Sequence, residues 1–294
     1  MTPVIEHKQV QANGIRYHVA STGDVGKPAL LCLHGFPEGW MSWRPIMERL
    51  ADRFHVVVPD MRGYGQTDKP AHGYDPLTLS DDVHALINVL GLQKPALLGH
   101  DWGGAVAWIC GHRFGAELRH LVVVNCTHPR TLLSGILRGE DLQPLRSIYM
   151  AYFQVPRVPE MLMTVGNGAL LRRGFKLAEG RKGAMDRGLV AEIIATFATP
   201  HDLTGPLNYY REAARMQLSA DGRRRMEEVY RQPVGCPITM IWGTRDHFLS
   251  EKVARRSHED AHRSVAWVGL PGVGHFVSLE APDELASELE RVLG

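Results

Sequence analysis

The sequence predicts an α/β protein whose mostly parallel, doubly wound sheet is interrupted by an inserted helical segment. Three observations predict this fold. Short apolar runs without polar alternation recur along the chain, as expected of strands that are buried on both faces. Helical patterns separate these runs, and strand–helix alternation is typical of a doubly wound sheet. Finally, the alternation stops near residue 129 and resumes near residue 233, and the residues between are helical patterns rich in Met, Tyr and Arg.

The expected elements run from an N-terminal hairpin to a C-terminal helix. Two alternating runs within residues 8–20 flank Asn13-Gly14, a pair that suits the positive backbone angles of a type I′ turn. Apolar residues repeat with helical spacing over 83–90, and Pro282 begins the last helix. The buried strands are expected at residues 29–33, 55–59, 96–98, 121–124, 238–242 and 265–268.

The helical segment divides the predicted core into two parts. We expect residues 1–128 and 233–294 to form the core, and residues 129–232 to form a helical cap, or lid. Because the segment follows the carboxyl end of a strand, it is placed where open α/β sheets bind ligands. The sequence therefore predicts a pocket between the core and the cap.

The composition argues against several classes of partner. Lys plus Arg (33) nearly balance Asp plus Glu (32), so no global field favours nucleic acid, and we interpret the arginine clusters near Arg172 and Arg223 as solvated helix faces. No apolar run approaches the roughly 18 residues of a membrane-spanning helix, and the N-terminal MTPVIEHKQV lacks the pattern of a secretion signal. We expect a cytoplasmic protein, monomeric or homodimeric, without a nucleic-acid partner or membrane insertion.

Cysteine and histidine usage indicates neither disulfides nor a metal site. The four cysteines contain no CxxC pair, which favours free buried thiols. The fifteen histidines contain no HExxH motif or comparable ligand spacing. We therefore expect no metal.

The stretch LLGHDWGGAVAW, residues 97–108, has the strand, sharp turn and helix context of a nucleophile elbow, with Asp101 where most such turns carry serine. A serine needs a base before it can attack, whereas a carboxylate is already an anion at neutral pH. Asp101 is therefore the candidate nucleophile. The alternative, that Asp101 only caps the following helix, is disfavoured by the glycines on both sides of the turn.

Three further motifs supply the partners that such a nucleophile needs. HGFPE, residues 34–38, follows a strand at the place that supplies an oxyanion-hole N–H, which we assign to Phe36, with Trp102 giving the other. Asp246 in WGTRDHF and His275 in GVGHF each follow a strand, and the order nucleophile, acid, histidine is that of α/β-hydrolases. His275, oriented by Asp246, would deprotonate the water that hydrolyses an ester intermediate.

Together these motifs make the chain resemble the α/β-hydrolase-fold epoxide hydrolases of the soluble or microbial type. The resemblance covers essentially the whole chain, from the hairpin through HGFPE, PDMRGYGQTDKP, GHDWGG, GTRDHF and GVGHF. It implies two lid tyrosines that hold the epoxide oxygen, Tyr149 in SIYMAYFQVP and Tyr210 in GPLNYYRE. A phenol is neutral at pH 7 and can donate a hydrogen bond to the opening oxygen. The neighbouring Tyr152 and Tyr209 are interpreted as packing or supporting residues.

One position departs from a pattern found in part of this group. Some aspartate-nucleophile relatives carry the acid after an earlier strand than the one before Asp246. The corresponding residue here is Asn125, in VVVNCTHP. Asp246 is therefore left as the acid.

The resemblance implies hydrolysis of an epoxide to a vicinal diol in two steps, through a covalent aspartyl ester and without a cofactor. Phe36 and Trp102 are expected to contact the small-molecule epoxide together with the two lid tyrosines. Met150, Met161 and Met163 favour an adaptable apolar lining and hence a lipophilic substrate.

Two alternatives stay open at this point. A haloalkane or haloacid dehalogenase uses the same carboxylate to displace halide, and the indole of Trp102 is compatible with either activity. Haloalkane-type relatives commonly carry a second side-chain donor at the position of Phe36, and the haloacid type carries Arg after the nucleophile; this sequence has neither. A non-catalytic ligand-binding protein would not need an intact triad. A serine esterase is disfavoured because the elbow lacks serine.

Overall fold

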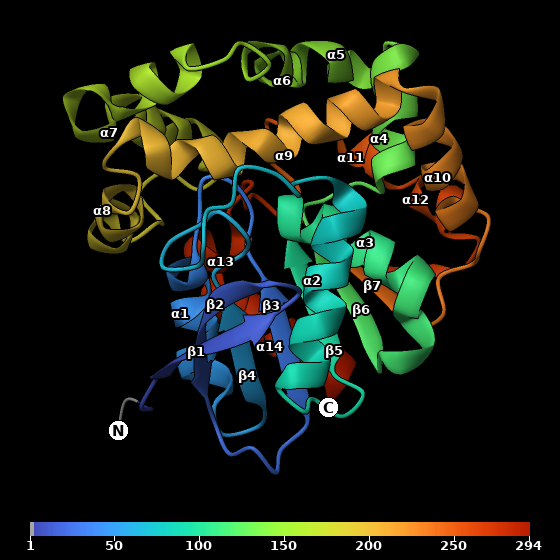
Figure 1. Cartoon of the computed structure of the whole chain (residues 1–294). Coiled ribbons are helices and arrows are strands. Elements are labelled where there is room, and N and C mark those ends of the chain that lie inside the picture. The colour runs from blue at the N-terminus through green and yellow to red at the C-terminus, as the bar shows by residue number, and fades with distance from the viewer. Residues whose placement is uncertain (1–2) are drawn as a thin grey trace.

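An eight-stranded sheet forms the centre of the protein in a computed structural model that describes residues 3–294 (Figure 1). Met1 and Thr2, with which the predicted core segment and the MTPVIEHKQV stretch begin, lie outside the described residues. The strand order is β1-β2-β4-β3-β5-β6-β7-β8. The strands are β1 (Glu6–Ala12), β2 (Ile15–Thr22), β3 (Ala29–Leu33), β4 (His55–Pro59), β5 (Ala96–His100), β6 (His120–Val124), β7 (Ile238–Gly243) and β8 (Val265–Leu270).

The sheet is mostly parallel, and only its first part is antiparallel. β1 pairs with β2 and β2 with β4 in antiparallel register, whereas β4, β3, β5, β6, β7 and β8 pair in parallel. Asn13 and Gly14 join β1 to β2 with φ of 43° and 79°, so the predicted hairpin is confirmed. The predicted parallel strands are also confirmed, each with its ends within two residues of the expected positions.

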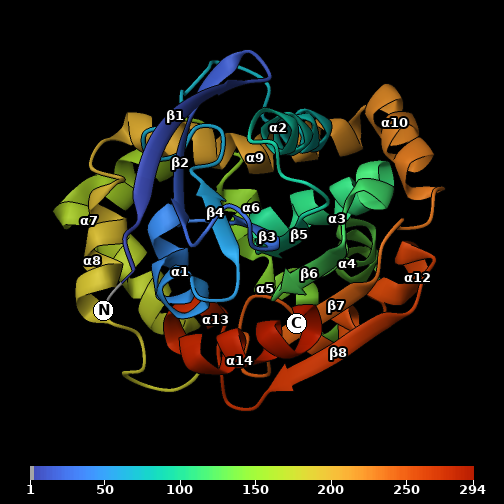
Figure 2. The same ribbon diagram turned by 90° about the horizontal axis from the view of Figure 1, so that it is seen from below.

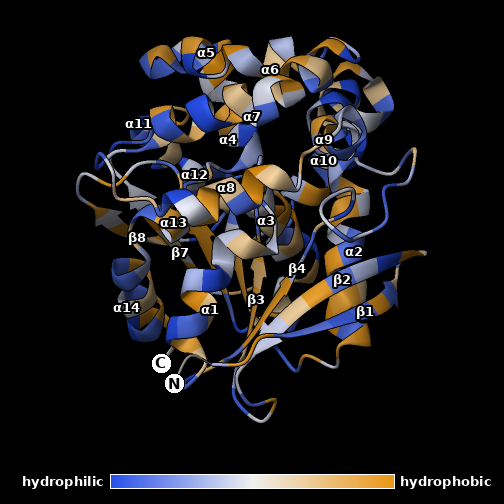
Figure 3. Cartoon of the chain, turned by 90° about the vertical axis from the view of Figure 1, so that its left-hand side faces the viewer, coloured by the Kyte–Doolittle hydropathy of each residue, from blue (hydrophilic) through white to orange (hydrophobic). Residues whose placement is uncertain are grey.

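Alternate side chains of the parallel strands enter two separate cores, which explains why these strands are apolar throughout. Leu97 and Val123 pack in the core on one face of the sheet, while Leu98 and Val122 pack in the core on the other. Helices α2 (Pro76–Val89) and α3 (Trp102–Phe114) cover the first face, and α1 (Arg44–Leu50) and α14 (Pro282–Leu293) cover the second (Figure 2). The central strands β3 and β4 are accordingly coloured as hydrophobic over most of their length, whereas the outer strand β1 is largely hydrophilic (Figure 3).

Short helices complete the core around the sheet. The last helix, α14, begins at Pro282 as the sequence predicts. The remaining core helices are η1 (Trp40–Trp43), η2 (Gly115–Glu117), α11 (Glu251–Ala254), α12 (Ser257–Ala261) and α13 (Val277–Glu280).

The predicted helical insertion lies between β6 and β7 and forms a layer over one end of the sheet (Figure 1). Its longest helix, α7, bends within Val165–Gly168, where three consecutive residues from Gly166 have positive φ. The insertion consists of α4 (Pro129–Leu137), η3 (Glu140–Leu142), α5 (Gln143–Arg146), α6 (Ile148–Tyr152), α7 (Val158–Ala178), α8 (Arg187–Ala195), α9 (Pro200–Leu218) and α10 (Ala220–Tyr230).

The cysteines form no disulfides. All four are free and buried, as the sequence predicted. Across residues 3–294, none of the helices combines the length and the hydrophobicity that crossing a bilayer requires.

Candidate active site

Asp101 occupies a sharp turn between β5 and α3. β5 ends one residue before it and α3 begins one residue after it. The backbone of Asp101 has φ 48° and ψ −118°, a strained conformation for a residue with a Cβ. The flanking glycines permit this turn: a Cβ on Gly99 would lie 2.4 Å from the carbonyl oxygen of Gly103, and a Cβ on Gly103 would lie 2.3 Å from that of Leu33. The Gly-x-Asp-x-Gly pattern is therefore explained by close backbone approach.

The carboxylate of Asp101 contacts the HGFPE loop and His275. Its Oδ1 accepts a 2.9 Å hydrogen bond from the Phe36 N–H, and its Oδ2 lies 3.6 Å from Nε2 of His275. Burial alone raises the pKa of this carboxyl, but the hydrogen bond and charge of His275 outweigh burial and hold the pKa below its usual range. Asp101 is therefore an anion at neutral pH.

His275 lies between two carboxylates. Its Nδ1 is 2.7 Å from Oδ2 of Asp246, while its Nε2 faces Asp101. Burial alone lowers the pKa of His275, but the charge of Asp246, with the contributions of Asp101, outweighs burial and raises the pKa to about 10. Without a bound substrate, His275 is therefore a cation at neutral pH.

Asp246 accepts hydrogen bonds from Asn125, which follows the neighbouring strand β6, and from the backbone of its own loop. The Asn125 side-chain amide donates to Oδ2 over 2.7 Å, and the backbone N–H groups of Phe248 and Leu249 donate to Oδ1. Burial alone raises the pKa of Asp246, but His275 and then Asn125 outweigh burial, so that the pKa lies below its usual range. Asn125, at the alternative position for the acid, thus holds the acid in place.

Trp102, the second expected oxyanion donor, is the first residue of α3. Its backbone N–H belongs to the N-terminal donors that an α-helix leaves without an internal acceptor. Among residues 3–294, however, the Asp101 carboxylate accepts a hydrogen bond from the Phe36 N–H and not from the Trp102 N–H. The indole ring packs edge-on against Tyr210, with ring centroids 4.9 Å apart. The oxyanion role of Trp102 stays a prediction.

Tyr149 and Tyr210 approach Asp101 from the cap. Tyr149 lies on α6 and Tyr210 on α9, with ring centroids 6.1 Å apart. Burial, and then the charge of Asp101, raise the pKa of both phenols well above the usual value. Both hydroxyls therefore stay protonated at neutral pH and are able to donate a hydrogen bond.

The two neighbouring tyrosines have different surroundings. Tyr209 is buried, and its hydroxyl donates to the carbonyl oxygen of Arg62 over 2.9 Å, so that it joins the cap to the core. The hydroxyl of Tyr152 is also buried but has no hydrogen-bond partner within the described residues. Packing accounts for Tyr209, whereas Tyr152 borders a cavity of the site.

One buried ion pair behind the nucleophile was not predicted from the sequence. His100 directly precedes Asp101; its Nδ1 lies 2.8 Å from Glu38, and its Nε2 lies 2.9 Å from the backbone carbonyl oxygen of His275. Glu38 also accepts a 2.6 Å hydrogen bond from the Gly35 N–H. Burial alone raises the pKa of Glu38, but the charge of His100 and its hydrogen bond outweigh burial and lower it. The pair therefore connects the HGFPE loop, the elbow and the histidine loop.

A second unpredicted pair lies in the cap. Arg211 directly follows Tyr210, and its guanidinium contacts the two carboxylate oxygens of Glu160 at 2.7 and 3.1 Å. The same guanidinium donates to the backbone carbonyls of Phe153 and Val155. Arg211 thus fixes α9 against the segment between α6 and α7, and hence fixes the two tyrosine-bearing helices relative to each other.

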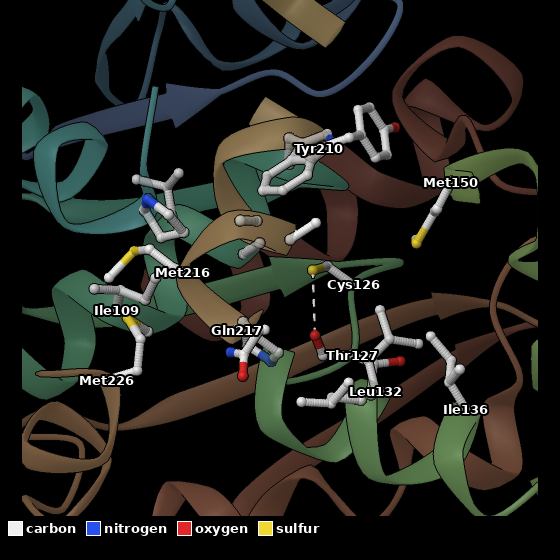
Figure 4. A pocket seen from close by; sticks show the side chains of 18 of the residues that line it. Ile109, Cys126, Thr127, Leu132, Ile136, Met150, Tyr210, Met216, Gln217 and Met226 are labelled. Atoms are coloured by element: carbon white, nitrogen blue, oxygen red, sulfur yellow. Dashed lines mark hydrogen bonds between the residues drawn. The ribbon is translucent and has the colours of Figure 1, made fainter. Parts of the chain in front are cut away.

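Two apolar cavities meet at the nucleophile. The first has a volume of about 400 Å³ and lies among α3, α4, α9 and α10; the second has a volume of about 430 Å³ and extends toward α7. Asp101, Tyr149 and Tyr210 line both cavities. Figure 4 shows the first cavity, with Tyr210 on one side of it and Met216 and Met226 on another.

Most of the expected substrate-contacting side chains border these cavities. Trp102 and Met150 line the first cavity, and Phe36 and Met163 line the second. The expectation for Met161 is wrong, because this residue is exposed and lines neither cavity. Two residues that are two positions apart point to opposite sides of a helix, so the burial of Met163 directs Met161 to solvent.

Metal-ligating residue types are dispersed in this region. Within residues 3–294, no three His, Cys, Asp or Glu side chains gather as they do around a metal ion. The carboxylates closest to the nucleophile are instead paired with protein donors, as Asp246 and Glu38 illustrate.

Comparison with known proteins gives matches over nearly the whole chain. Residues 30–288 match the model of the family described as "Alpha/beta hydrolase family". Similar proteins include Epoxide hydrolase 4 of Mus musculus, 32% identical over 94% of this chain and 75% of that protein, and AB hydrolase superfamily protein YfhM of Bacillus subtilis, 35% identical over 93% and 92%.

Solved structures superpose on nearly the whole of this chain. Epoxide Hydrolase A from Mycobacterium thermoresistibile superposes with a TM-score of 0.84 at 26% identity, covering 99% of this chain and 98% of that one. Epoxide hydrolase VrEH1 from Vigna radiata superposes with a TM-score of 0.80 at 28% identity, covering 98% of both chains. With its eight-stranded sheet, its inserted helices and its family match over residues 30–288, the chain belongs to the alpha/beta hydrolase family.

Proposed function

We propose that this alpha/beta hydrolase is an epoxide hydrolase, which adds water to a lipophilic epoxide and forms a vicinal diol. One observation carries the proposal: the ionised Asp101 lies with the protonated Tyr149 and Tyr210 where two apolar cavities meet. Opening a strained ether needs a nucleophile at carbon and a donor at oxygen, and these groups supply both. The names of relatives such as Epoxide hydrolase 4 support the same activity.

In the first step, Oδ2 of Asp101 attacks a ring carbon, and the bond between that carbon and the epoxide oxygen breaks. Oδ1 stays on the Phe36 N–H and becomes the carbonyl oxygen of the new ester. Tyr149 and Tyr210 stabilise the departing oxygen, and one of them gives it a proton. The product is a hydroxyalkyl ester of Asp101, and nothing leaves the site.

Formation of the ester changes the protonation of His275. The negative charge of Asp101 is lost on esterification, so one of the two charges that raise the pKa of His275 disappears. The imidazolium can then return a proton to the ionised tyrosine and become a neutral base. Asp246 continues to orient the ring through its 2.7 Å contact with Nδ1.

In the second step, His275 takes a proton from water, and the resulting hydroxide attacks Cγ of the ester. The developing oxyanion on Oδ1 is stabilised by the Phe36 N–H and, in this proposal, by the Trp102 N–H. The bond between Cγ and Oδ2 then breaks, and the departing alkoxide takes the proton of the newly added hydroxyl. Diol is released, and the carboxylate of Asp101 and the imidazolium of His275 are restored.

The two parts of the chain have separate tasks in this scheme. The core segments, residues 1–128 and 233–294, supply the nucleophile, the histidine and the acid. The cap, residues 129–232, supplies both tyrosines. We propose this division as the functional domain organisation of the chain.

Product analysis with two substrates tests the activity. The purified protein is incubated with a simple aryl epoxide and, separately, with a bromoalkane, and diol and bromide are measured. We expect diol from the first and no bromide from the second, because the Phe36 side chain at the nucleophile is a hydrocarbon ring that cannot donate to a halide. Bromide without diol would favour a dehalogenase, and binding of both compounds without either product would favour a non-catalytic ligand-binding protein.

A further inference from the structure

Two connections join the cap to the core, and one core side chain contacts both. The first runs from β6 to His128, the residue before α4, and the second runs from α10 through Gln232 to β7. His112 on α3 lies between them: its Nδ1 is 2.6 Å from the carbonyl oxygen of Gln232, and its Nε2 is 2.9 Å from Nε2 of His128. This histidine pair, His112 and His128, therefore joins both cap connections to one core helix.

The hydrogen-bond partners fix where the protons of the histidine pair lie. A carbonyl oxygen only accepts, so Nδ1 of His112 carries a proton and donates a hydrogen bond to Gln232. Nδ1 of His128 caps α4 by accepting from the Arg130 N–H over 3.3 Å, so His128 carries its proton on Nε2. That Nε2–H donates to Nε2 of His112. Both rings are therefore neutral, and each of their four nitrogens has a partner.

The surroundings disfavour a charge on either ring. Both side chains are buried, and burial lowers the pKa of His112 and lowers that of His128 well below the usual value. The hydrogen bond to Gln232 and the charge of Asp260 raise the pKa of His112 but do not outweigh burial. The titratable groups that face the pair from the elements around it are Tyr230 on α10, Arg130 on α4, Asp260 on α12 and His262 after it.

An added proton disrupts the pair. A polar cavity of about 390 Å³ between α2, α3 and α10 gives water access to His112, and its charged lining residues are Asp81, Arg113, Arg225 and Glu228. His112 takes the first proton, because the pKa of His128 is lowered further. A proton on Nε2 of His112 then faces the Nε2–H of His128. His128 must give up this contact, or move its own proton to Nδ1 and lose the Arg130 N–H, so protonation loosens the start of the cap in either case.

The pair lies beside the first cavity of the active site. Thr127, which precedes His128, lines this cavity, as does Pro129, which follows it (Figure 4). Tyr230 also lines it and packs edge-on against both rings of the pair, with centroids 5.5 and 4.9 Å apart. The cap carries the two tyrosines of the site between the two connections, so a shift at this junction moves them relative to the nucleophile.

We propose that His112 and His128 are positioning residues for ring opening: as a pair of neutral imidazoles they hold both cap connections on α3 and so keep the cap tyrosines in reach of Asp101. This inference rests on the proposed epoxide hydrolase function. Protonation of the pair slows ring opening. It affects ester hydrolysis less, because the base, the acid and the Phe36 N–H all belong to the core.

Three substitutions of His112 test the positioning role. The amide of His112→Gln lies near the position of Nε2 and can accept from His128, whereas that of His112→Asn lies near Nδ1 and can donate to Gln232. His112→Phe keeps neither hydrogen bond. Single-turnover ring opening at about pH 7 should slow by about 10- to 100-fold in His112→Phe and by less in the other two. Ester hydrolysis should slow less than ring opening in all three, whereas a general loss of structure would slow both steps alike.

The pH profile is a readout that a purely structural role would not move. Between about pH 5 and 7, Asp101 stays ionised and both cap tyrosines stay protonated, so the reacting groups of ring opening do not titrate. Ring opening in the wild type should nevertheless slow as the pH falls across this range. NMR should show that the Arg130 amide exchanges faster with solvent over the same range, after correction for the intrinsic effect of pH. His112→Gln, which cannot be protonated there, should lose both effects.

His120→Gln is the matched control. Burial also lowers the pKa of His120, and its Nε2 lies 2.9 Å from the hydroxyl of Thr239, but both residues stand on core strands and contact neither cap connection. This variant should keep the wild-type ratio of the two steps and the wild-type pH profile. The same change in His120→Gln and His112→Gln, or an unchanged ratio of the two steps in folded His112→Gln and His112→Asn, overturns the proposal.

Amide exchange separates this inference from the proposed function. Faster exchange of Arg130 in acid that His112→Gln abolishes, in a protein that hydrolyses no epoxide, would support the histidine pair as the cap fastening and refute the proposed function. Epoxide hydrolysis with the same ratio of steps and the same pH profile in the wild type and in His112→Gln would support the function and refute the role of the pair.

Discussion

The core half and the cap half of the candidate site hold their functional groups by different means. In the core, the carboxylates and the imidazole are fixed by direct hydrogen bonds, as in the 2.7 Å contact between His275 and Asp246. In the cap, the tyrosine rings are held by aromatic packing: Tyr210 packs edge-on against Phe153 with centroids 4.9 Å apart, and Tyr149 packs against the same ring at 5.4 Å.

The difference matches the chemistry that each half performs in the proposed reaction. The core groups change charge during the cycle, so they need fixed donors and acceptors that stabilise each charge where it forms. Each tyrosine must be protonated when the epoxide binds and must reach the departing oxygen, and burial raises the pKa of both so that they carry their protons at that stage. Changes in the core half should therefore affect ester hydrolysis most, whereas changes in the cap half should affect ring opening most.

Substitution of the core base should have the largest effect. In His275→Gln, Asp101 can still attack because a carboxylate needs no base, but the ester lacks a group to activate water. We expect turnover to fall by about 10²- to 10⁴-fold and the ester to accumulate. Mass spectrometry should show the protein gaining the full mass of the epoxide, since ring opening expels no leaving group.

The location of this adduct is the control. Digestion should place it on the peptide that contains Asp101, and Asp101→Ala in the same background should abolish it. An active His275→Gln enzyme without any adduct, sampled fast enough to detect one in a single turnover, would contradict the covalent mechanism and favour direct attack of water on the epoxide.

Loss of the cap donors should have the next largest effect. Tyr149→Phe and Tyr210→Phe should each slow ring opening by up to about 10²- to 10³-fold, and the double variant should be the slowest. Tyr209→Phe is the matched control, because it removes a hydroxyl that donates to the carbonyl of Arg62 and does not line either cavity. It should cost about 1 kcal/mol of folding stability and leave single-turnover ring opening unchanged. Full activity in both single variants and the double variant would remove the tyrosines from the mechanism.

The structure brings the predicted residues of the core half together because each of them follows a strand. Asp101 follows β5 directly and Asp246 lies three residues after the end of β7, and parallel strands bring their carboxyl ends to one edge of the sheet. Local pattern alone therefore assembles residues that are far apart in the chain. The tyrosines needed the family resemblance, since nothing in the spacing of Tyr149 and Tyr210 places them opposite the nucleophile.

The features that sequence reasoning missed depend on contacts between distant segments. Glu38 lies 62 positions from His100, and Glu160 lies 51 positions from Arg211, so neither pair shows a periodic signal. The bend of α7 at Val165–Gly168 was likewise not predicted, although Gly166 and Gly168 weaken a helix there. The available hint for the first pair was a polar side chain in each of two motifs, Glu38 in HGFPE and His100 in GHDWGG.

Substitutions in the two buried pairs should have a smaller effect on the catalytic rate constants. The step that is slowed should differ between the pair in the core and the pair in the cap. Glu160→Gln leaves the guanidinium of Arg211 buried without its counter-charge, and it should cost about 3–5 kcal/mol in urea unfolding. Glu38→Gln should cost less, because the glutamine oxygen can still accept a hydrogen bond from His100 or from the Gly35 N–H, and no guanidinium is left without its counter-charge. Glu160→Gln should slow ring opening more than ester hydrolysis, and Glu38→Gln should do the reverse.

Single-turnover kinetics distinguish these positioning roles from a general loss of structure. The two rate constants are measured for each variant at a temperature at which it is folded by circular dichroism. Equal slowing of both steps in both variants would mean that the pairs support the fold alone, and the contrast between the halves would not hold.

The smallest expected effect concerns the charge coupling within the core half. His275 should titrate with a pKa of about 10 in the substrate-free enzyme. In Asp101→Asn the side chain is uncharged, as it is in the ester intermediate. An opposite charge within a few ångströms shifts a pKa by about 1–3 units, so the pKa of His275 should fall by about that amount in this variant. NMR titration of the imidazole measures both values.

The pKa of His275 in the folded protein lies above the ordinary value of 6.5, so its stabilising contribution is fully present below pH 6.5 and is lost as the pH rises through about 10. The free energy of unfolding should therefore decline over this window in the wild type and decline less in Asp101→Asn. An unchanged pKa of His275 in that variant would show that the ester keeps the imidazole protonated, and His275 would then need another route to become the base.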